Sequence, residues 1–234
     1  MAVEQREAPA EESLLRHPNV AYVTPFVVFL ALLAAGRYLP FSTETIFGLG
    51  FVIVFALLVW LSRGVISLRT SHLAGSVLLG AAVFAIWIGP DVLWPAYRQS
   101  WLFNNSLVGA PKSSHALAVK ASLAFIVFRV LGSVVNVPVL EELFWRGWLM
   151  RWLISKDFQK VPLGTYTPQS FWMVAVLFAS EHGSYWDVGL VTGVLYNWWM
   201  VRTRSLGDCI VAHAVTNACL ATYVLARNQW QYWL

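Results

Sequence analysis

Apolar residues in this chain gather in long runs that charged residues and turn signals separate. A helix that crosses a membrane needs about 20 mostly apolar residues, and these runs approach that length. The pattern predicts eight helices, at about 20–36, 45–61, 72–90, 115–135, 138–154, 170–182, 187–201 and 206–226. The runs at 115–135 and 138–154 either cross separately or form one kinked passage, and the sequence leaves both open.

Composition places these helices in a membrane. Of the 234 residues, 58% are hydrophobic and only 12% are charged, and the mean hydropathy is +0.61. Such values exclude an ordinary soluble domain and predict an all-α fold, a polytopic membrane bundle of about eight helices. We expect one domain at 20–226, between polar tails at 1–19 and 227–234. The links at 183–186 and 202–205 are short, so the last three helices should pack as antiparallel neighbours.

Charge sets the expected location and partners. The net charge is +4 without any dense basic run, which argues against a nucleic-acid partner. If 115–154 is a single passage, most Lys and Arg residues lie on the side of the N-terminus, which the positive-inside rule assigns to the cytoplasm. We therefore expect an integral, multi-pass membrane protein in contact with the lipid bilayer.

The first candidate site is a charged cluster inside an apolar run, Glu141-Glu142-Leu143-Phe144-Trp145-Arg146. A charge at membrane depth costs a few kcal/mol, so such residues are rarely idle. Glu142 and Arg146 are four apart on one helix face and can pair. Glu141 is rotated away by roughly 100°. One carboxylate is thus neutralised and the other is left for chemistry.

Two further clusters complete the candidate site. His182 ends an apolar run four residues after Phe178, and His213 and Asn217 share a face in the middle of the last run. Glu141 could take a proton from water while His182 orients that water or shuttles its proton. His213 and Asn217 could donate hydrogen bonds to the oxyanion of a tetrahedral intermediate. The set predicts a hydrolytic site.

The three motifs, in this order, resemble those of the CPBP family of intramembrane proteases. This family comprises CAAX proteases and bacteriocin-processing enzymes, also called the ABI family, and is related to the CAAX prenyl endopeptidase Rce1. The resemblance covers about residues 116–226, the expected catalytic core. The Arg146-Gly147 step and Pro138 look typical of bacterial members, so the resemblance implies a protein of a bacterial inner membrane. It also implies an eight-helix bundle with a cavity open to the cytoplasm. It also implies that Glu141 and His182 activate water, that His213 and Asn217 stabilise the oxyanion, and that Glu142 with Arg146 holds the architecture, with Phe178 in support.

The resemblance implies an endopeptidase for a membrane-associated protein or peptide, which could be lipidated, but it does not name the substrate. The basic, Trp-rich chain is also compatible with the CAAX prenyl protease-related subgroup, which occurs with exosortase sorting systems.

Metal dependence stays open, because family members have been described both as metalloproteases and as metal-independent glutamate proteases. Glu141, His182 and His213 could ligate zinc with an open fourth position. The sequence lacks a His-Glu-x-x-His motif, and we expect no obligatory metal.

Two other classes compete with the protease. A non-catalytic relative could act as an immunity or scaffold protein, although the intact set of motif residues argues against it. A small transporter could use Lys120, Arg129 and Glu141 as an ion path, but no inverted repeat is visible.

Overall fold

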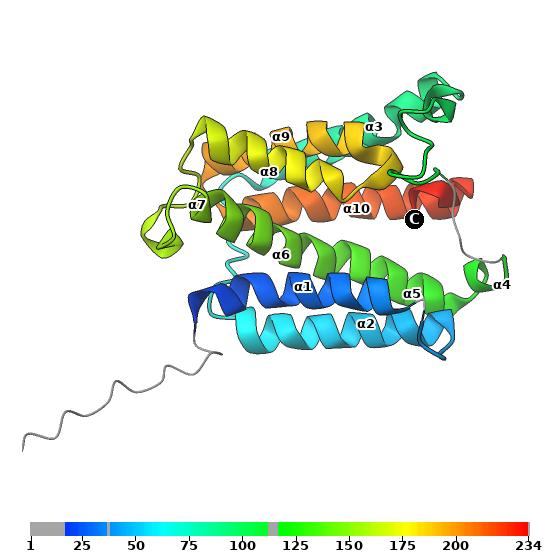
Figure 1. The fold of residues 1–234 in the computed structure, drawn as a ribbon, viewed down its shortest axis with the longest axis horizontal. Coiled ribbons are helices and arrows are strands. Elements are labelled where there is room, and N and C mark those ends of the chain that lie inside the picture. Colours follow the sequence, from blue (N-terminus) through cyan, green and yellow to red (C-terminus); the bar gives the residue numbers. More distant parts are fainter. Residues whose placement is uncertain (1–16, 37, 112–116, 234) are drawn as a thin grey trace, which may run out of the picture.

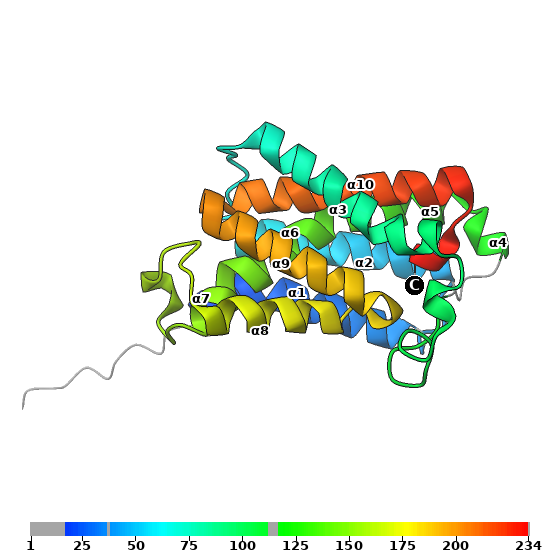
Figure 2. The same ribbon diagram turned by 90° about the horizontal axis from the view of Figure 1, so that it is seen from above.

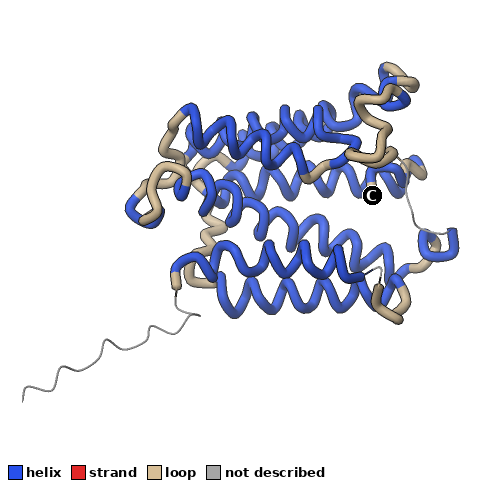
Figure 3. Tube along the Cα trace, in the orientation of Figure 1, coloured by secondary structure: helices blue, strands red, loops and turns tan. Residues whose placement is uncertain are grey.

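The computed structural model describes residues 17–36, 38–111 and 117–233, so most of the predicted tail at 1–19 lies outside the described residues. Within these ranges the regular structure is helical and contains no strand (Figure 3), which confirms the predicted all-α membrane bundle. The helices are α1 Pro18–Gly36, α2 Thr43–Leu57, α3 Leu73–Leu93, α4 Leu117–Lys120, α5 Leu123–Leu131, α6 Val137–Glu142, α7 Met150–Trp152, α8 Pro168–Ser180, α9 Trp186–Thr203 and α10 Leu206–Arg227.

The described residues form seven main helical segments instead of the expected eight. α5, α6 and α7 are joined by two π-helical segments, Gly132–Asn136 and Leu143–Leu149, into one helix of 30 residues, Leu123–Trp152. The two runs that the sequence left open are therefore a single passage.

Pro138 explains how this passage continues through a residue that usually ends a helix. In the π-helical turn before it, the Val137 N–H donates to the Gly132 carbonyl, five residues back. Proline has no N–H to continue this ladder to Ser133. The Asn217 amide donates to the Ser133 carbonyl instead, at 2.7 Å. A side chain from α10 thus satisfies the backbone group that the proline leaves open.

The long passage crosses the middle of the bundle. In Figure 1 it runs diagonally between the α1–α2 pair and a second layer of α3, α8, α9 and α10. Figure 2, turned by 90°, shows α3 and α10 side by side and α8 beside α9. Because the passage packs against both layers, its side chains form the centre of the main core, with Leu140, Leu143 and Met150 fully buried.

The outer faces of the bundle are apolar. Five described helices are long and apolar enough to cross a membrane: α1, α2 with its extension to Ser62, α3, Leu123–Trp152 and α10. Large side chains such as Val52, Leu78 and Val176 are more than half exposed. Extended apolar surface of this kind needs a lipid environment.

The two ends of the bundle differ in charge. One end, on the left of Figure 1, holds the N-termini of α1, α3, α8 and α10 and the C-termini of α7 and α9; we call it the basic end. Its described cations are Arg63, Arg69, Arg151, Lys156, Lys160, Arg202 and Arg204, against the acids Asp157 and Asp208. The other end has Arg98, Lys120, Arg129 and Arg227 against Glu44, Asp91, Glu181 and Asp187. The positive-inside rule assigns the basic end to the cytoplasm.

Candidate active site

Glu142 lies at the centre of the buried polar cluster. Its Oε1 accepts hydrogen bonds from Arg146 Nη1 at 3.1 Å and from His213 Nδ1 at 2.9 Å. The Glu142 and Arg146 side chains are both 0% exposed. The ion pair predicted from their spacing is present. The bond to His213, which comes from α10, had no signal in the sequence because 71 residues separate the partners.

Each nitrogen of the Arg146 guanidinium has a hydrogen-bond partner. Its Nε donates to the Asn197 amide oxygen at 3.0 Å, and its Nη2 donates to the Gly193 carbonyl at 3.4 Å. The guanidinium carbon lies 4.7 Å from the centre of the Phe178 ring. Planar, charge-assisted contacts of this kind fix an arginine in one orientation. Sequence reasoning missed Asn197, a buried amide in an apolar helix that also donates to the Phe171 carbonyl at 2.8 Å.

Gly193 allows this close packing. A Cβ there would lie 3.0 Å from the Ala175 carbonyl oxygen and 3.3 Å from the Phe178 ring, which is tighter than most Cβ contacts in proteins. The absence of a side chain lets α8 and α9 approach each other and brings the Gly193 carbonyl to Arg146.

Both histidines lie near the Phe178 ring. The centre of the Phe178 ring is 4.7 Å from that of His182 and 6.4 Å from that of His213. His182 Nδ1 is 2.7 Å from the Phe178 carbonyl oxygen, which only accepts, so this nitrogen carries the proton. Burial lowers the pKa of His182 to about 4. Its ring is therefore neutral at neutral pH and presents Nε2 as a proton acceptor.

His213 has the same tautomer for a different reason. Its Nδ1 lies 2.9 Å from Glu142 Oε1, the oxygen that also accepts from Arg146 Nη1, so Nδ1 is assigned as the donor. Nε2 is then the free acceptor of the neutral ring and becomes a donor when the ring gains a second proton. The Tyr196 ring lies 5.3 Å away and is fixed by the Tyr196 hydroxyl, 2.7 Å from Thr216 Oγ1.

Glu141 differs from its neighbour. It is 9% exposed, and its Oε2 is buried without a hydrogen-bond partner. Within the described part of the chain its side chain forms no ion pair, although it is close enough to Glu181, Glu142 and Arg146 for their charges to interact. Glu181 directly precedes His182 and had no assigned role. Glu142 Oε2 is also unpartnered, but its other oxygen has two donors.

Asn217 bonds a backbone group of the central passage and neither of the two carboxylates. One of its amide hydrogens is committed to the Ser133 carbonyl, as described above, and the other remains available. The position predicted for an oxyanion donor therefore also has a structural partner that the sequence did not indicate.

The predicted zinc ligands do not form a ligand set. Across residues 17–36, 38–111 and 117–233, no three His, Cys, Asp or Glu side chains lie close enough together to hold a metal ion. A zinc site with an open position needs three converging protein ligands. The geometry thus does not fit the metal that Glu141, His182 and His213 could have bound.

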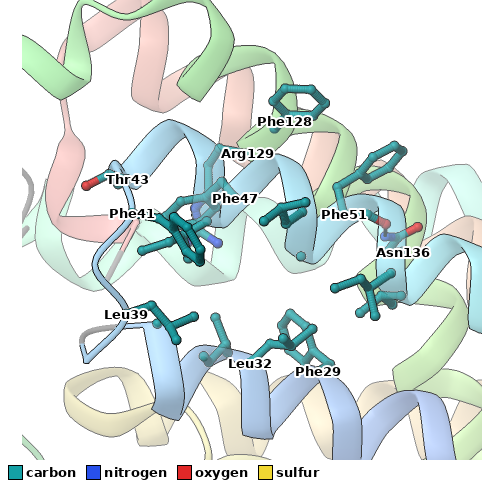
Figure 4. Close-up of a pocket in the computed structure, with 17 residues that line it drawn as sticks. Phe29, Leu32, Leu39, Phe41, Thr43, Phe47, Phe51, Phe128, Arg129 and Asn136 are labelled. Atoms are coloured by element: carbon teal, nitrogen blue, oxygen red, sulfur yellow. Dashed lines mark hydrogen bonds between the residues drawn. The ribbon is translucent and has the colours of Figure 1, made fainter.

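An apolar cavity of about 400 Å³ lies beside this site, between α1, α2 and α5 (Figure 4). Phe29, Leu32, Phe47 and Phe51 line it, and Asn136 lies at one end. The buried Oδ1 of Asn136 has no hydrogen-bond partner. None of the predicted site residues lines this cavity.

Fold and site together define a polytopic helical membrane protein with carboxylates, an arginine and a histidine buried in its core. Residues 122–219 match the family model described as type II CAAX prenyl endopeptidase Rce1-like. This part of the chain is similar to the Rce1-like family, as the three motifs predicted, and it contains all the predicted site residues. The family is a protease family, which supports a protease at the family level. Comparisons with curated proteins and with solved structures give no match.

Proposed function

We propose that the chain is an intramembrane endopeptidase in which Glu141 accepts the proton of the attacking water. The observation that carries the proposal is the contrast between two adjacent carboxylates. Glu142 is bonded to Arg146 and His213, whereas Glu141 has a buried oxygen without a partner. A buried polar group without a partner costs free energy, and ionisable groups retained in a membrane bundle mark functional sites.

The proposed reaction is peptide hydrolysis. The water oxygen bonds to the carbonyl carbon of the substrate while its proton moves to Glu141. The tetrahedral intermediate then collapses, the C–N bond breaks, and the proton passes from Glu141 to the leaving amine. A positioned acid–base group of this kind contributes about 10²- to 10⁴-fold to the rate.

The proposed roles of the other residues follow from their hydrogen bonds. His182 presents Nε2 as an acceptor and would orient the water. His213, held by Glu142, would donate to the oxyanion through Nε2 once this nitrogen has taken up a proton from solvent, which it returns when the intermediate collapses. Asn217 would contribute its remaining N–H. We propose no obligatory metal, and the lack of a converging ligand set supports this.

The first experiment compares Glu141→Gln with wild type in liposomes, using a library of hydrophobic peptides. We expect the substitution to reduce cleavage by about 10²- to 10⁴-fold, as expected for loss of a general base. Glu44→Gln, which changes a carboxylate at the start of α2 outside the site, is the matched control. Each protein is assayed with and without a chelator, and the thermal midpoint verifies folding.

The results separate the candidate classes. Loss of cleavage in Glu141→Gln but not in Glu44→Gln supports the proposal, and insensitivity to the chelator supports metal independence. Equal cleavage in all three folded proteins would contradict the role of Glu141 and turn attention to a scaffold or a transporter. Cleavage that disappears with chelator and returns with zinc would contradict the metal-independent form.

We further propose that the substrate carries a lipid, supported by the cavity in Figure 4. The cavity is apolar and within the size range of small-ligand sites, about 300–1,000 Å³. It ends at Asn136, five residues before Glu141 on the same passage, or about 7.5 Å along a helix at 1.5 Å per residue. A chain bound there would hold a neighbouring peptide near Glu141.

Gly50→Leu tests this point. Gly50 lines the cavity, and a Cβ added there meets no atom within 4 Å, so the new side chain would fill the cavity without disturbing the fold. We expect cleavage of a lipidated peptide to fall at least about tenfold relative to its unlipidated form, because two methylenes lose burial at roughly 0.8 kcal/mol each. Gly89→Leu, equally open but outside the cavity, is the control. Equal loss for both peptides would argue against a lipid-binding role.

A further inference from the structure

A second cavity, at the basic end, is polar and rich in arginine. It encloses about 290 Å³ between α1, the segment at 63–72, α7 and the turn from α9 to α10. The side chains that matter for its chemistry are Tyr22, Arg69, Ser71, Arg151, Arg204 and Ser205. None of them belongs to the candidate active site. No Asp or Glu lines this cavity.

The Arg151 side chain is buried and bonded to backbone carbonyl groups. It is 7% exposed, its Nε donates to the Gly147 carbonyl at 2.6 Å, and its Nη1 donates to the Val161 carbonyl at 3.3 Å. The guanidinium also lies 5.0 Å from the Phe158 ring and 5.5 Å from the Tyr22 ring. These contacts fix its position but do not neutralise its charge. Burying a charge without a counter-ion costs free energy, so an anion bound in the cavity would stabilise Arg151.

Arg69 and Arg204 add two exposed guanidinium groups. Neither forms an ion pair with any residue that the structure describes. Arg204 follows α9 with a φ of 53°, in the left-handed region where glycine or asparagine is usual. Its side-chain stem packs against Gly164, where a Cβ would lie 2.9 Å from Arg204 Cγ. An arginine is thus kept at a position that favours glycine, which indicates a use for its charge.

Asp208, two residues after the lining residue Leu206, has hydrogen-bond partners of its own. Asp208 Oδ2 accepts from the Ser71 N–H, and its Oδ1 accepts from the His72 N–H and the Ser76 hydroxyl. These bonds fix the segment that carries Arg69 but direct the carboxylate towards the start of α3. The N-cap Ser205 and the first residue of α10, Leu206, also line the cavity, and a helix N-terminus favours negative charge.

We propose that this cavity binds a phosphate group, carried by an anionic phospholipid headgroup or by a soluble phosphate compound. Three guanidinium groups, a phenol and serine hydroxyls suit an anion with several acceptor oxygens, and arginine binds phosphate through paired N–H donors. The cavity lies at the basic end, where anionic lipids of the cytoplasmic leaflet attract arginines. The site lies outside the proposed catalytic machinery and does not depend on it.

The experiment measures binding to the full-length protein in two arms. In lipid-depleted detergent, inorganic phosphate is titrated by calorimetry. In nanodiscs of phosphatidylcholine with or without phosphatidylglycerol, lipid retained after extraction is counted by native mass spectrometry. The variants are Arg151→Gln and the double variant Arg69→Gln with Arg204→Gln. Arg202→Gln is the matched control, because Arg202 lies in the same turn but does not line the cavity.

We expect the double variant to weaken binding about 25-fold, or about fivefold per arginine near a charged membrane surface. Arg202→Gln should leave it unchanged. Arg151→Gln could unfold the protein through its carbonyl bonds, so the double variant decides the outcome. If the double variant retains less phosphatidylglycerol than wild type, the ligand is a lipid headgroup. If only its binding of inorganic phosphate falls, the ligand is a soluble phosphate compound. No binding in either arm, or equal loss in Arg202→Gln, would overturn the proposal.

Discussion

Two buried arginines organise two distant parts of the molecule in similar ways. Arg98 donates to the Ser184 carbonyl at 2.6 Å, pairs with Asp91 at 2.8 Å and with Asp187 at 2.9 Å, and lies 4.1 Å from the Tyr185 ring. Arg146 likewise bonds a carbonyl, a carboxylate and an amide and lies against an aromatic ring. Arg98 joins the end of α3 to the start of α9, whereas Arg146 joins the central passage to α9.

The two arginines differ in the number and burial of the carboxylates with which they pair. Arg98 has two carboxylates of its own, and their side chains are 17% and 16% exposed. Arg146 has a single, fully buried carboxylate, which it shares with His213. A second carboxylate, Glu141, directly precedes Glu142, and its buried Oε2 has no hydrogen-bond partner. The Arg98 cluster can therefore serve only as a clamp, that is, a set of ion pairs that holds helices together. The Arg146 cluster contains such a clamp and joins it to His213 and Glu141, which can exchange protons.

The largest effect in this comparison is expected for Arg146→Gln. The substitution leaves Glu142 buried with only His213 as a partner, and breaking a buried pair in this way costs about 3–5 kcal/mol. We expect a correspondingly lower free energy of unfolding in detergent titration, together with loss of cleavage.

A double-mutant cycle provides the control for this prediction. Glu142→Gln combined with Arg146→Gln removes both charges, so most of the stability should return. The clamp would be contradicted if the double variant were as unstable as the sum of the two single variants.

Local sequence patterns predicted part of the Arg146 cluster and most of the helices. The spacing of Glu142 and Arg146 on one helix turn gave their pair, and hydrophobic runs gave most of the passages. The bond from His213 to Glu142 was not predictable in this way, because it depends on how α10 packs against the central passage. Asn197 was missed although it is an amide within an apolar helix, a signal that could have identified it.

Pro138 shows a second limit of sequence patterns. A proline usually starts or ends a helix, which is why two separate crossings remained possible. The π-helical turn before it and the Asn217 side chain supply what the proline lacks. That compensation comes from another helix, 84 residues away in the sequence, and no local rule can anticipate it.

A smaller effect is expected for Arg98→Gln. Its carboxylates are partly exposed, so water can solvate them when the arginine is lost, and the cost should be about 1.5–3 kcal/mol, the range for hydrogen bonds to charged groups. Cleavage of a short peptide should continue at the wild-type rate below the new thermal midpoint, because Arg98 contacts none of the carboxylates or histidines of the candidate site. Rate and midpoint are measured on the same liposome samples as for Arg146→Gln. If Arg98→Gln abolished cleavage while the protein stayed folded, the two clusters would be coupled through α9, and the distinction between a clamp and a reactive cluster would fail.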